Sequence, residues 1–173
     1  MNVYKTLMAA LAVVAFPLAF GQTMDMKSCP MMQSSQHAKG VDHRGDQAMG
    51  FSHEKTQHHF RLFSDGGSID VVVKSKTDAD QVAAIRTHLK MIAGMFSQGD
   101  FHLPMFIHDR AVPGQKTMQS KRRAITYSYG DLSEGGRVRI RTSDVKALAA
   151  IHKFLRFQVK DHRTGDTGNI EKS

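Results

Sequence analysis

Two segments of the chain follow the same order of local patterns, and this order is the strongest constraint on the fold. In the first segment, residues 59–63 and 69–73 are rich in β-branched and aromatic side chains, and the Asp-Gly-Gly sequence between them is typical of a β-hairpin turn. Apolar residues then recur at intervals of three and four, which predicts a helix with one buried face. That face consists of Val82, Ile85, Leu89, Ile92 and Phe96.

The second segment has the same patterns in the same order. Residues 124–129 and 138–142 are strand-like, Gly135-Gly136 marks the turn, and a second amphipathic helix follows. Its inward positions are Val145, Leu148, Ile151, Leu155 and Val159. Ile151 lies 66 positions after Ile85, so the two helical patterns superpose. We therefore predict an α+β fold, a tandem ββα-ββα repeat that forms a four-stranded antiparallel sheet with two helices on one face.

The remaining segments are assigned around these two halves. Residues 58–166 are expected to form a single α+β domain, in which the long connection 98–123 folds over the core because it is too apolar to stay in solvent. A short helix is expected after Pro113. Residues 22–57 are rich in Ser, Gln, Gly, His and Met and are predicted to be a flexible leader. Residues 167–173 are predicted to be a loose tail.

The N-terminus has the features of an export signal. Lys5 provides a positive charge, and residues 7–20 form an uncharged apolar run that is too short to span a bilayer. Small residues at Ala19 and Gly21 fit a cleavage site before Gln22. We therefore predict a signal peptide at residues 1–21, a periplasmic or secreted mature protein, and no membrane span.

The net charge limits the kinds of partner that the protein can bind, and the cysteine content limits how the fold can be stabilised. The chain has a net charge of +8, which in a cytoplasmic protein favours nucleic acid as a partner. Export disfavours that partner and leaves anionic surfaces or anionic small ligands. The single cysteine, Cys29, excludes an internal disulfide framework. Stability is therefore expected to come from packing or from a bound ligand.

Several short motifs resemble those of a family of small exported bacterial proteins. They are RGDQAMGF at 44–51, HHF at 58–60, GDF at 99–101, PMFIH at 104–108, FLRFQ at 154–158 and DHRTGD at 161–166. The resemblance implies export and a shared fold, and it implies no mechanism. Some members are labelled aspartate carbamoyltransferase, a label that this sequence does not support because a carbamoyl-phosphate motif such as Ser-Thr-Arg-Thr is absent.

Methionine and histidine are unusually frequent, with 11 and 10 residues respectively. Thioethers suit Cu(I) and imidazoles suit Cu(II), Zn and Ni, so we predict a binding protein that captures copper or another soft or borderline metal ion. The candidate core ligands are His88, Met95, His102, Met105 and His108. The candidate leader ligands are Met24, Met26, Met31, Met32, His37 and His43.

Two other interpretations stay open at this stage. In the first, the protein is a binding module for a small molecule or a protein partner, without a metal, and its Met and His residues are packing residues. In the second, His and Asp residues of the central connection belong to a hydrolase or transferase. No nucleophile elbow, phosphate loop or dinucleotide fingerprint supports an enzyme, so no catalytic residue is predicted.

Overall fold

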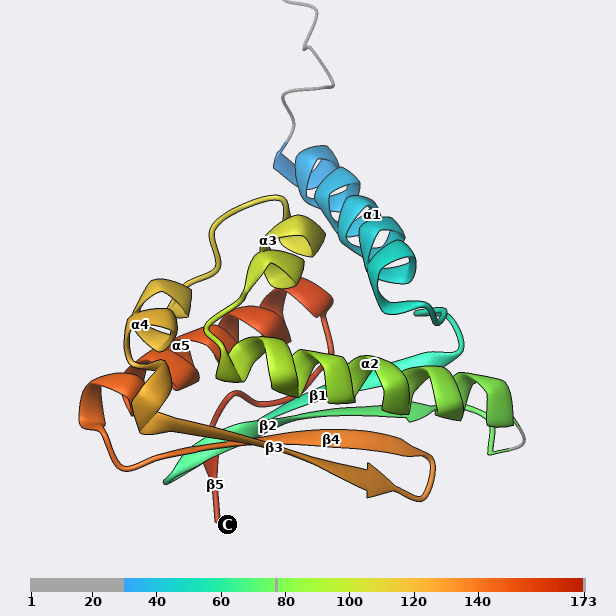
Figure 1. The fold of residues 1–173 in the computed structure, drawn as a ribbon. Helices are drawn as coiled ribbons and strands as arrows, with labels where there is room; N and C mark the ends of the chain where they lie inside the picture. The colour runs from blue at the N-terminus through green and yellow to red at the C-terminus, as the bar shows by residue number, and fades with distance from the viewer. Residues whose placement is uncertain (1–29, 77, 173) are drawn as a thin grey trace, which may run out of the picture.

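The computed structural model describes residues 30–76 and 78–172, and they form an α+β structure (Figure 1). The predicted signal peptide lies outside the described residues, as do Met24, Met26 and Cys29. None of the helices within the described ranges combines the length and the apolar character needed to cross a bilayer.

The sheet contains five strands rather than the predicted four, and it is mixed rather than antiparallel throughout. The strands are β1 (Thr56–Phe63), β2 (Gly66–Val73), β3 (Ile125–Leu132), β4 (Gly135–Thr142) and β5 (Ile170–Glu171), in the order β3-β4-β2-β1-β5. The first four pair antiparallel, and the pairing of β2 with β4 joins the two hairpins. The short β5 adds parallel to the free edge of β1.

The additional strand corrects the prediction of a loose tail. The backbone N–H of Phe60 donates to the Asp166 carboxylate at 2.8 Å, and the Arg156 side chain donates to the carbonyl of Gly168 at 3.0 Å. These two long-range bonds fix the chain beside β1, where an unpaired strand edge is available. Local sequence does not reveal them because their partners are 106 and 12 residues apart.

All labelled helices lie on the same side of the sheet in Figure 1. The helices α2 (Ala79–Ser97) and α5 (Val145–His162) follow the two hairpins and pack directly on the strands. The predicted inward residues Ile85 and Leu89 are buried, as are Ile151 and Leu155. Val145 is an exception with 80% exposure, because it is the first residue after the N-cap Asp144 and lies beyond the packed part of α5.

The leader prediction is wrong from Pro30 onward, because this segment forms the helix α1 (Pro30–Met49). The buried positions Val41, Gly45 and Met49 recur every four residues and place one face of α1 against the rest of the protein. This face contains a glycine and few large apolar residues, so its periodicity is weak in the sequence.

Polar contacts hold α1 in place where apolar burial is small. The Arg44 side chain donates to the carbonyl of Ile107 at 2.9 Å, and Arg163 donates to both oxygens of Asp42 at 2.7 Å. All of these contacts are to residues more than 60 positions away, which a reading of local composition does not detect.

The connection 98–123 covers the core, as predicted. It forms α3 (His102–His108), α4 (Gln115–Ser120) and the 3₁₀ turn η2 (Arg122–Ala124), so the expected short helix after Pro113 is confirmed. Its side chains Phe101, Val112 and Met118 are buried.

Candidate functional site

Two adjoining chambers lie where α1, α5 and the start of β1 meet. The inner chamber has a volume of about 60 Å³ and the outer chamber about 320 Å³, and Met49, His58 and His162 line both. The inner walls are apolar and come from β1, β2, α2, α3 and α5; they include Phe60, Ile69, Ile92, Leu103, Ile107 and Phe154. The polar residues of the inner chamber are His58, His88, Gln158 and His162, and no Lys, Arg, Asp or Glu among the described residues lines it.

The outer chamber has a different chemical character. Asp42 from α1, Lys74 from the end of β2 and Arg163 from the end of α5 line it, together with polar side chains of the β1 start. A ligand that occupies both chambers therefore meets an apolar, uncharged end and a polar, charged end.

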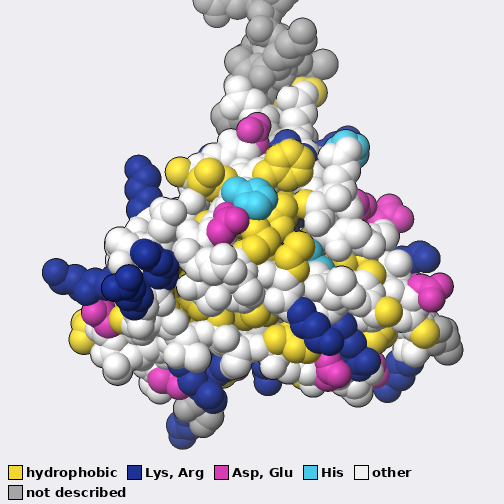
Figure 2. Space-filling model, in the orientation of Figure 1, with side chains coloured by type: hydrophobic (Ala, Val, Ile, Leu, Met, Phe, Trp, Pro, Cys, Tyr) yellow, Lys and Arg dark blue, Asp and Glu magenta, His cyan; other side chains and the backbone are white. Residues whose placement is uncertain are grey.

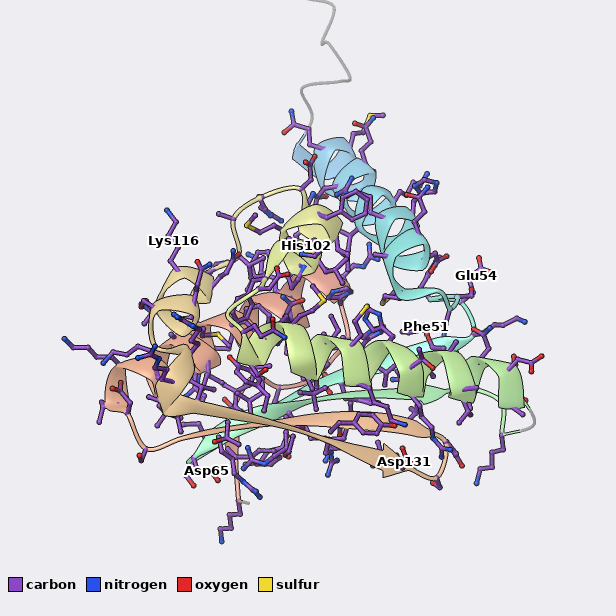
Figure 3. All side chains as sticks on the ribbon, viewed as in Figure 1. Phe51, Glu54, Asp65, His102, Lys116 and Asp131 are labelled. Carbon is purple, nitrogen blue, oxygen red and sulfur yellow. The ribbon has the colours of Figure 1, made fainter. Side chains whose placement is uncertain are left out.

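Four imidazoles from four different elements cluster around the inner chamber. The rings of His58 (β1) and His162 (α5) stack with centroids 5.4 Å apart and planes 12° from parallel, and His108 (α3) meets His162 edge-on at 4.9 Å. The ring of Phe51 lies 5.5 Å from His88 (α2) and 6.0 Å from His58. Figure 3 shows Phe51 beside α2, where the chain has left α1.

Burial keeps these imidazoles neutral. Loss of solvent lowers the pKa of His88 to about 4, and the same cause, strengthened by the neighbouring His88 and His59, lowers the pKa of His58 to about 4. Burial also lowers the pKa of His162 well below its ordinary value. At neutral pH each ring therefore offers one hydrogen-bond donor and one acceptor and no charge.

Two polar atoms of the inner chamber have no hydrogen-bond partner among the described residues. They are Nδ1 of His88 and Nε2 of Gln158, whose residues are 7% and 4% exposed. Leaving a buried polar group unsatisfied costs about 1–3 kcal/mol, so such groups need an explanation. A hydrogen-bonding molecule inside the chamber supplies one.

The orientation of Gln158 is set by a polar cluster behind the chamber. His108 Nε2 lies 2.9 Å from Oε1 of Gln158, and His108 Nδ1 lies 2.5 Å from an oxygen of Asp161. Arg110 donates to the other oxygen of Asp161 at 2.6 Å, and His37 of α1 lies 3.1 Å from the same carboxylate. Asp161 therefore links α1, α3 and α5 at the back of the chamber.

The charge state of this cluster results from opposing effects. Burial raises the pKa of Asp161, but hydrogen bonds from His108 and His37 and the charge of Arg110 outweigh it, so the pKa is lowered and the carboxylate is ionised. Burial lowers the pKa of His108, against the raising effect of Asp161 and Gln158, and the net direction is downward. A neutral His108 donates from one ring nitrogen only, so the amide of Gln158 and the imidazole adjust together.

The structure brings together two of the five predicted core metal ligands and separates the other three. His88 lines the inner chamber. His108 lies behind the chamber wall, where it contacts the lining residues Gln158 and His162. His102 is exposed on α3, where Figure 3 labels it, and its Nδ1 lies 2.8 Å from an oxygen of Asp100.

The two methionines of the predicted core set are not among the residues that line the inner chamber. The Met105 sulfur accepts from Gln115 Nε2 at 2.8 Å, and Met95 packs against the core. Within residues 30–76 and 78–172, no three His, Cys, Asp or Glu side chains form a group that could hold a metal ion.

The predicted leader ligands are also distributed among different environments. Met31 and Met32 at the start of α1 are 79% and 40% exposed, and His43 is exposed farther along the same helix. His37 points the other way, toward Asp161. The remaining two, Met24 and Met26, lie outside the described residues.

The sequence prediction missed His58, Gln158 and His162 as pocket residues. Two sequence signals could have placed them near the core. The first is that His58 lies two residues before the buried Phe60, on the same face of β1. The second is that His162 follows Gln158 by four residues on one face of α5. That these faces meet His88 of α2 depends on the tertiary structure.

Comparison of the chain with protein-family models, with curated proteins and with solved structures gave no match. The resemblance to a family of small exported bacterial proteins therefore stays a prediction, and the geometry of the site is the basis for the proposed function.

Proposed function

We propose that this protein is a binding protein for a small organic molecule, whose uncharged end it holds in the inner chamber of the two-chamber pocket. The observation that carries the proposal is the pair of unpartnered atoms, His88 Nδ1 and Gln158 Nε2, in the same apolar chamber. An apolar cavity with a few convergent polar groups is the usual form of a small-molecule site.

The lining of the inner chamber defines the group that enters it. A charged group is disfavoured because the imidazoles there are neutral and the described residues of the walls include no ionised side chain. The ligand meets one atom of the Gln158 amide and Nδ1 of His88, so it carries a hydrogen-bonding group such as a hydroxyl, an amide or a carbonyl. A cavity of about 150 Å³ holds benzene, so the chamber of about 60 Å³ accepts only a short alkyl ketone, amide or alcohol end.

We further propose that the protein acts after export, in the periplasm or outside the cell, and that its two halves are a tandem ββα repeat. The first is supported by the signal-like residues 1–21, and the second by the order of hairpin and helix in both halves. No catalytic step is proposed, because none of the described residues that line the pocket is an activated nucleophile.

Fragment binding followed by NMR tests the pocket directly. We expect 2-butanone and N-methylacetamide to shift the side-chain resonances of His88 and Gln158, and acetate to leave them unchanged. Because each lost hydrogen bond costs about 1–3 kcal/mol, His88→Leu and Gln158→Leu should weaken binding at least about tenfold. His102→Leu, an exposed histidine on α3, is the matched control and should bind as the native protein does.

Two results would contradict the proposal. The first is an equal response to acetate and to the uncharged probes. The second is binding that survives both pocket substitutions, since it would locate the probes elsewhere.

Copper capture is a second, separate proposal, and the exposure of the first methionines of α1 favours it. Met31 and Met32 present their thioethers to solvent, so packing does not account for them. They follow Met24 and Met26 closely in sequence, and exposed thioethers in series suit Cu(I).

Anaerobic Cu(I) titration of the mature chain tests this second proposal. Replacing Met24, Met26, Met31 and Met32 together by leucine is expected to weaken Cu(I) binding at least about tenfold. Met91→Leu, an exposed methionine of α2, is the control and should leave the affinity unchanged. If the variant with all four substitutions binds Cu(I) with native affinity, the N-terminal methionine site is refuted. If only His88→Leu weakens Cu(I) binding, the copper site lies in the pocket instead.

A further inference from the structure

The solvent-exposed stripe of α5 is cationic along its whole length. Lys146, Lys153, Arg156 and Lys160 are exposed and fall at intervals of seven, three and four residues, which places them on one helix face. With a rise of 1.5 Å per residue, the stripe from Lys146 to Lys160 extends about 21 Å. The opposite face of α5 is buried in the core, so the three lysine side chains point away from it, whereas Arg156 donates to the carbonyl of Gly168.

Neighbouring elements widen this stripe into a patch. Lys116 on α4 and Arg122 and Arg123 on η2 are exposed, and α4 packs against α5. Figure 2 shows Lys and Arg side chains gathered at the left end of the molecule, beside α4 and the start of α5. We call the set Lys116, Arg122, Arg123, Lys146, Lys153 and Lys160 the basic patch.

The basic patch is not neutralised by the protein itself. Within the part of the chain that the structure describes, none of its six residues takes part in an ion pair. The nearby carboxylate of Asp144 is already bound to Lys121 at 2.8 Å. By contrast, the arginines of the open sheet face, such as Arg137 and Arg139, are paired with Asp70 and Asp65.

We propose that the basic patch binds the anionic surface of a lipid bilayer. A cluster of four to eight Lys and Arg residues is the size that associates with anionic lipid, at about 1 kcal/mol per residue. The patch extends in two directions, along α5 and across to α4 and η2, which fits a flat surface better than a single linear polyanion. Val145, 80% exposed beside Lys146, adds an apolar side chain to the contact region.

The association is electrostatic and reversible. The apolar face of α5 stays in the core, so the helix does not insert into the bilayer. Salt therefore weakens the contact by screening, because charges separated by more than a Debye length of about 8 Å at physiological ionic strength interact little.

Co-sedimentation of the mature protein with vesicles tests the proposal. The protein should bind vesicles that contain phosphatidylglycerol, fail to bind pure phosphatidylcholine vesicles, and dissociate in high salt. The triple variant Lys146→Gln, Lys153→Gln, Lys160→Gln is expected to bind at least about tenfold more weakly. The control triple Lys39→Gln, Lys90→Gln, Lys172→Gln removes the same charge from exposed positions elsewhere and should bind nearly as the native protein does.

Three outcomes would overturn it: no binding to anionic vesicles, equal losses in both triple variants, or binding of dextran sulfate with the same lysine dependence when vesicles do not bind. The last would identify a soluble polyanion as the partner. Circular dichroism of both variants shows that they are folded, so a loss of binding reports on the surface.

Discussion

Replacing Gly66 by alanine is expected to abolish or nearly abolish stable folding. Gly66 has φ +146°, a backbone conformation that L side chains rarely adopt, and a Cβ placed there would lie 2.0 Å from the carbonyl oxygen of Ile140. Because the Cβ would collide with backbone and not with a movable side chain, β2 and β4 would have to separate where the two hairpins join. The expected loss is about 4 kcal/mol or more, a large part of the 5–15 kcal/mol by which domains are stable.

Urea unfolding of Gly66→Ala beside Gly130→Ala measures this effect. Gly130 lies on the neighbouring strand β3, and a Cβ there has nothing within 4 Å, so its replacement should change the stability little. Failure to recover folded Gly66→Ala protein agrees with the expectation. A decrease in the free energy of unfolding of less than about 1 kcal/mol would contradict the prediction. It would show that β2 and β4 can separate enough to accommodate a Cβ at position 66.

Acidification from pH 6.5 to pH 4 is expected to destabilise the protein through its buried histidines. His58 and His88 have pKa values of about 4 in the folded protein and 6.5 when exposed. Between these values the unfolded chain binds protons that the folded chain does not, so stability is present above pH 6.5 and is lost as the pH falls. For His88, which is 7% exposed, the loss is about 3 kcal/mol by pH 4.

Carboxylates contribute in a lower window. The pKa values of Asp161 and Asp166 are lowered from 3.8, so their stabilising contacts are lost only as the pH falls below that value. The loss between pH 6.5 and pH 4 therefore reports mainly on the histidines.

The His88→Leu variant separates the contribution of this histidine. It removes an unsatisfied buried nitrogen, so we expect it to be at least as stable as the native protein at neutral pH and to lose about 3 kcal/mol less on acidification. Urea unfolding at several pH values between 6.5 and 4 measures both effects, with His102→Leu as the exposed control. A native pH profile in His88→Leu would show that His88 does not titrate in this window. If His88→Leu is more stable than the native protein but binds the ligand more weakly, His88 has the behaviour expected of a residue that serves function at the expense of stability.

Local sequence predicted those elements whose own side chains carry a clear period. The hairpins around Gly66 and Gly135 and the apolar faces of α2 and α5 were predicted near their observed positions, because turn glycines and three-to-four spacing act over a few residues. The same reasoning failed for α1. Its buried face is Val41, Gly45 and Met49, which becomes recognisable only against the partners that Arg44 and Asp42 contact.

The sequence by itself determined the α+β class, the order of hairpin and helix in each half, and the apolar connection that covers the core. Only the tertiary structure decided the fifth strand, the docking of α1 and the pocket. The physical reason is distance along the chain: His58, His88 and His162 come from three elements spread over more than 100 residues. Their shared burial, and the neutral state that follows from it, exist only when the sheet and helices have packed together.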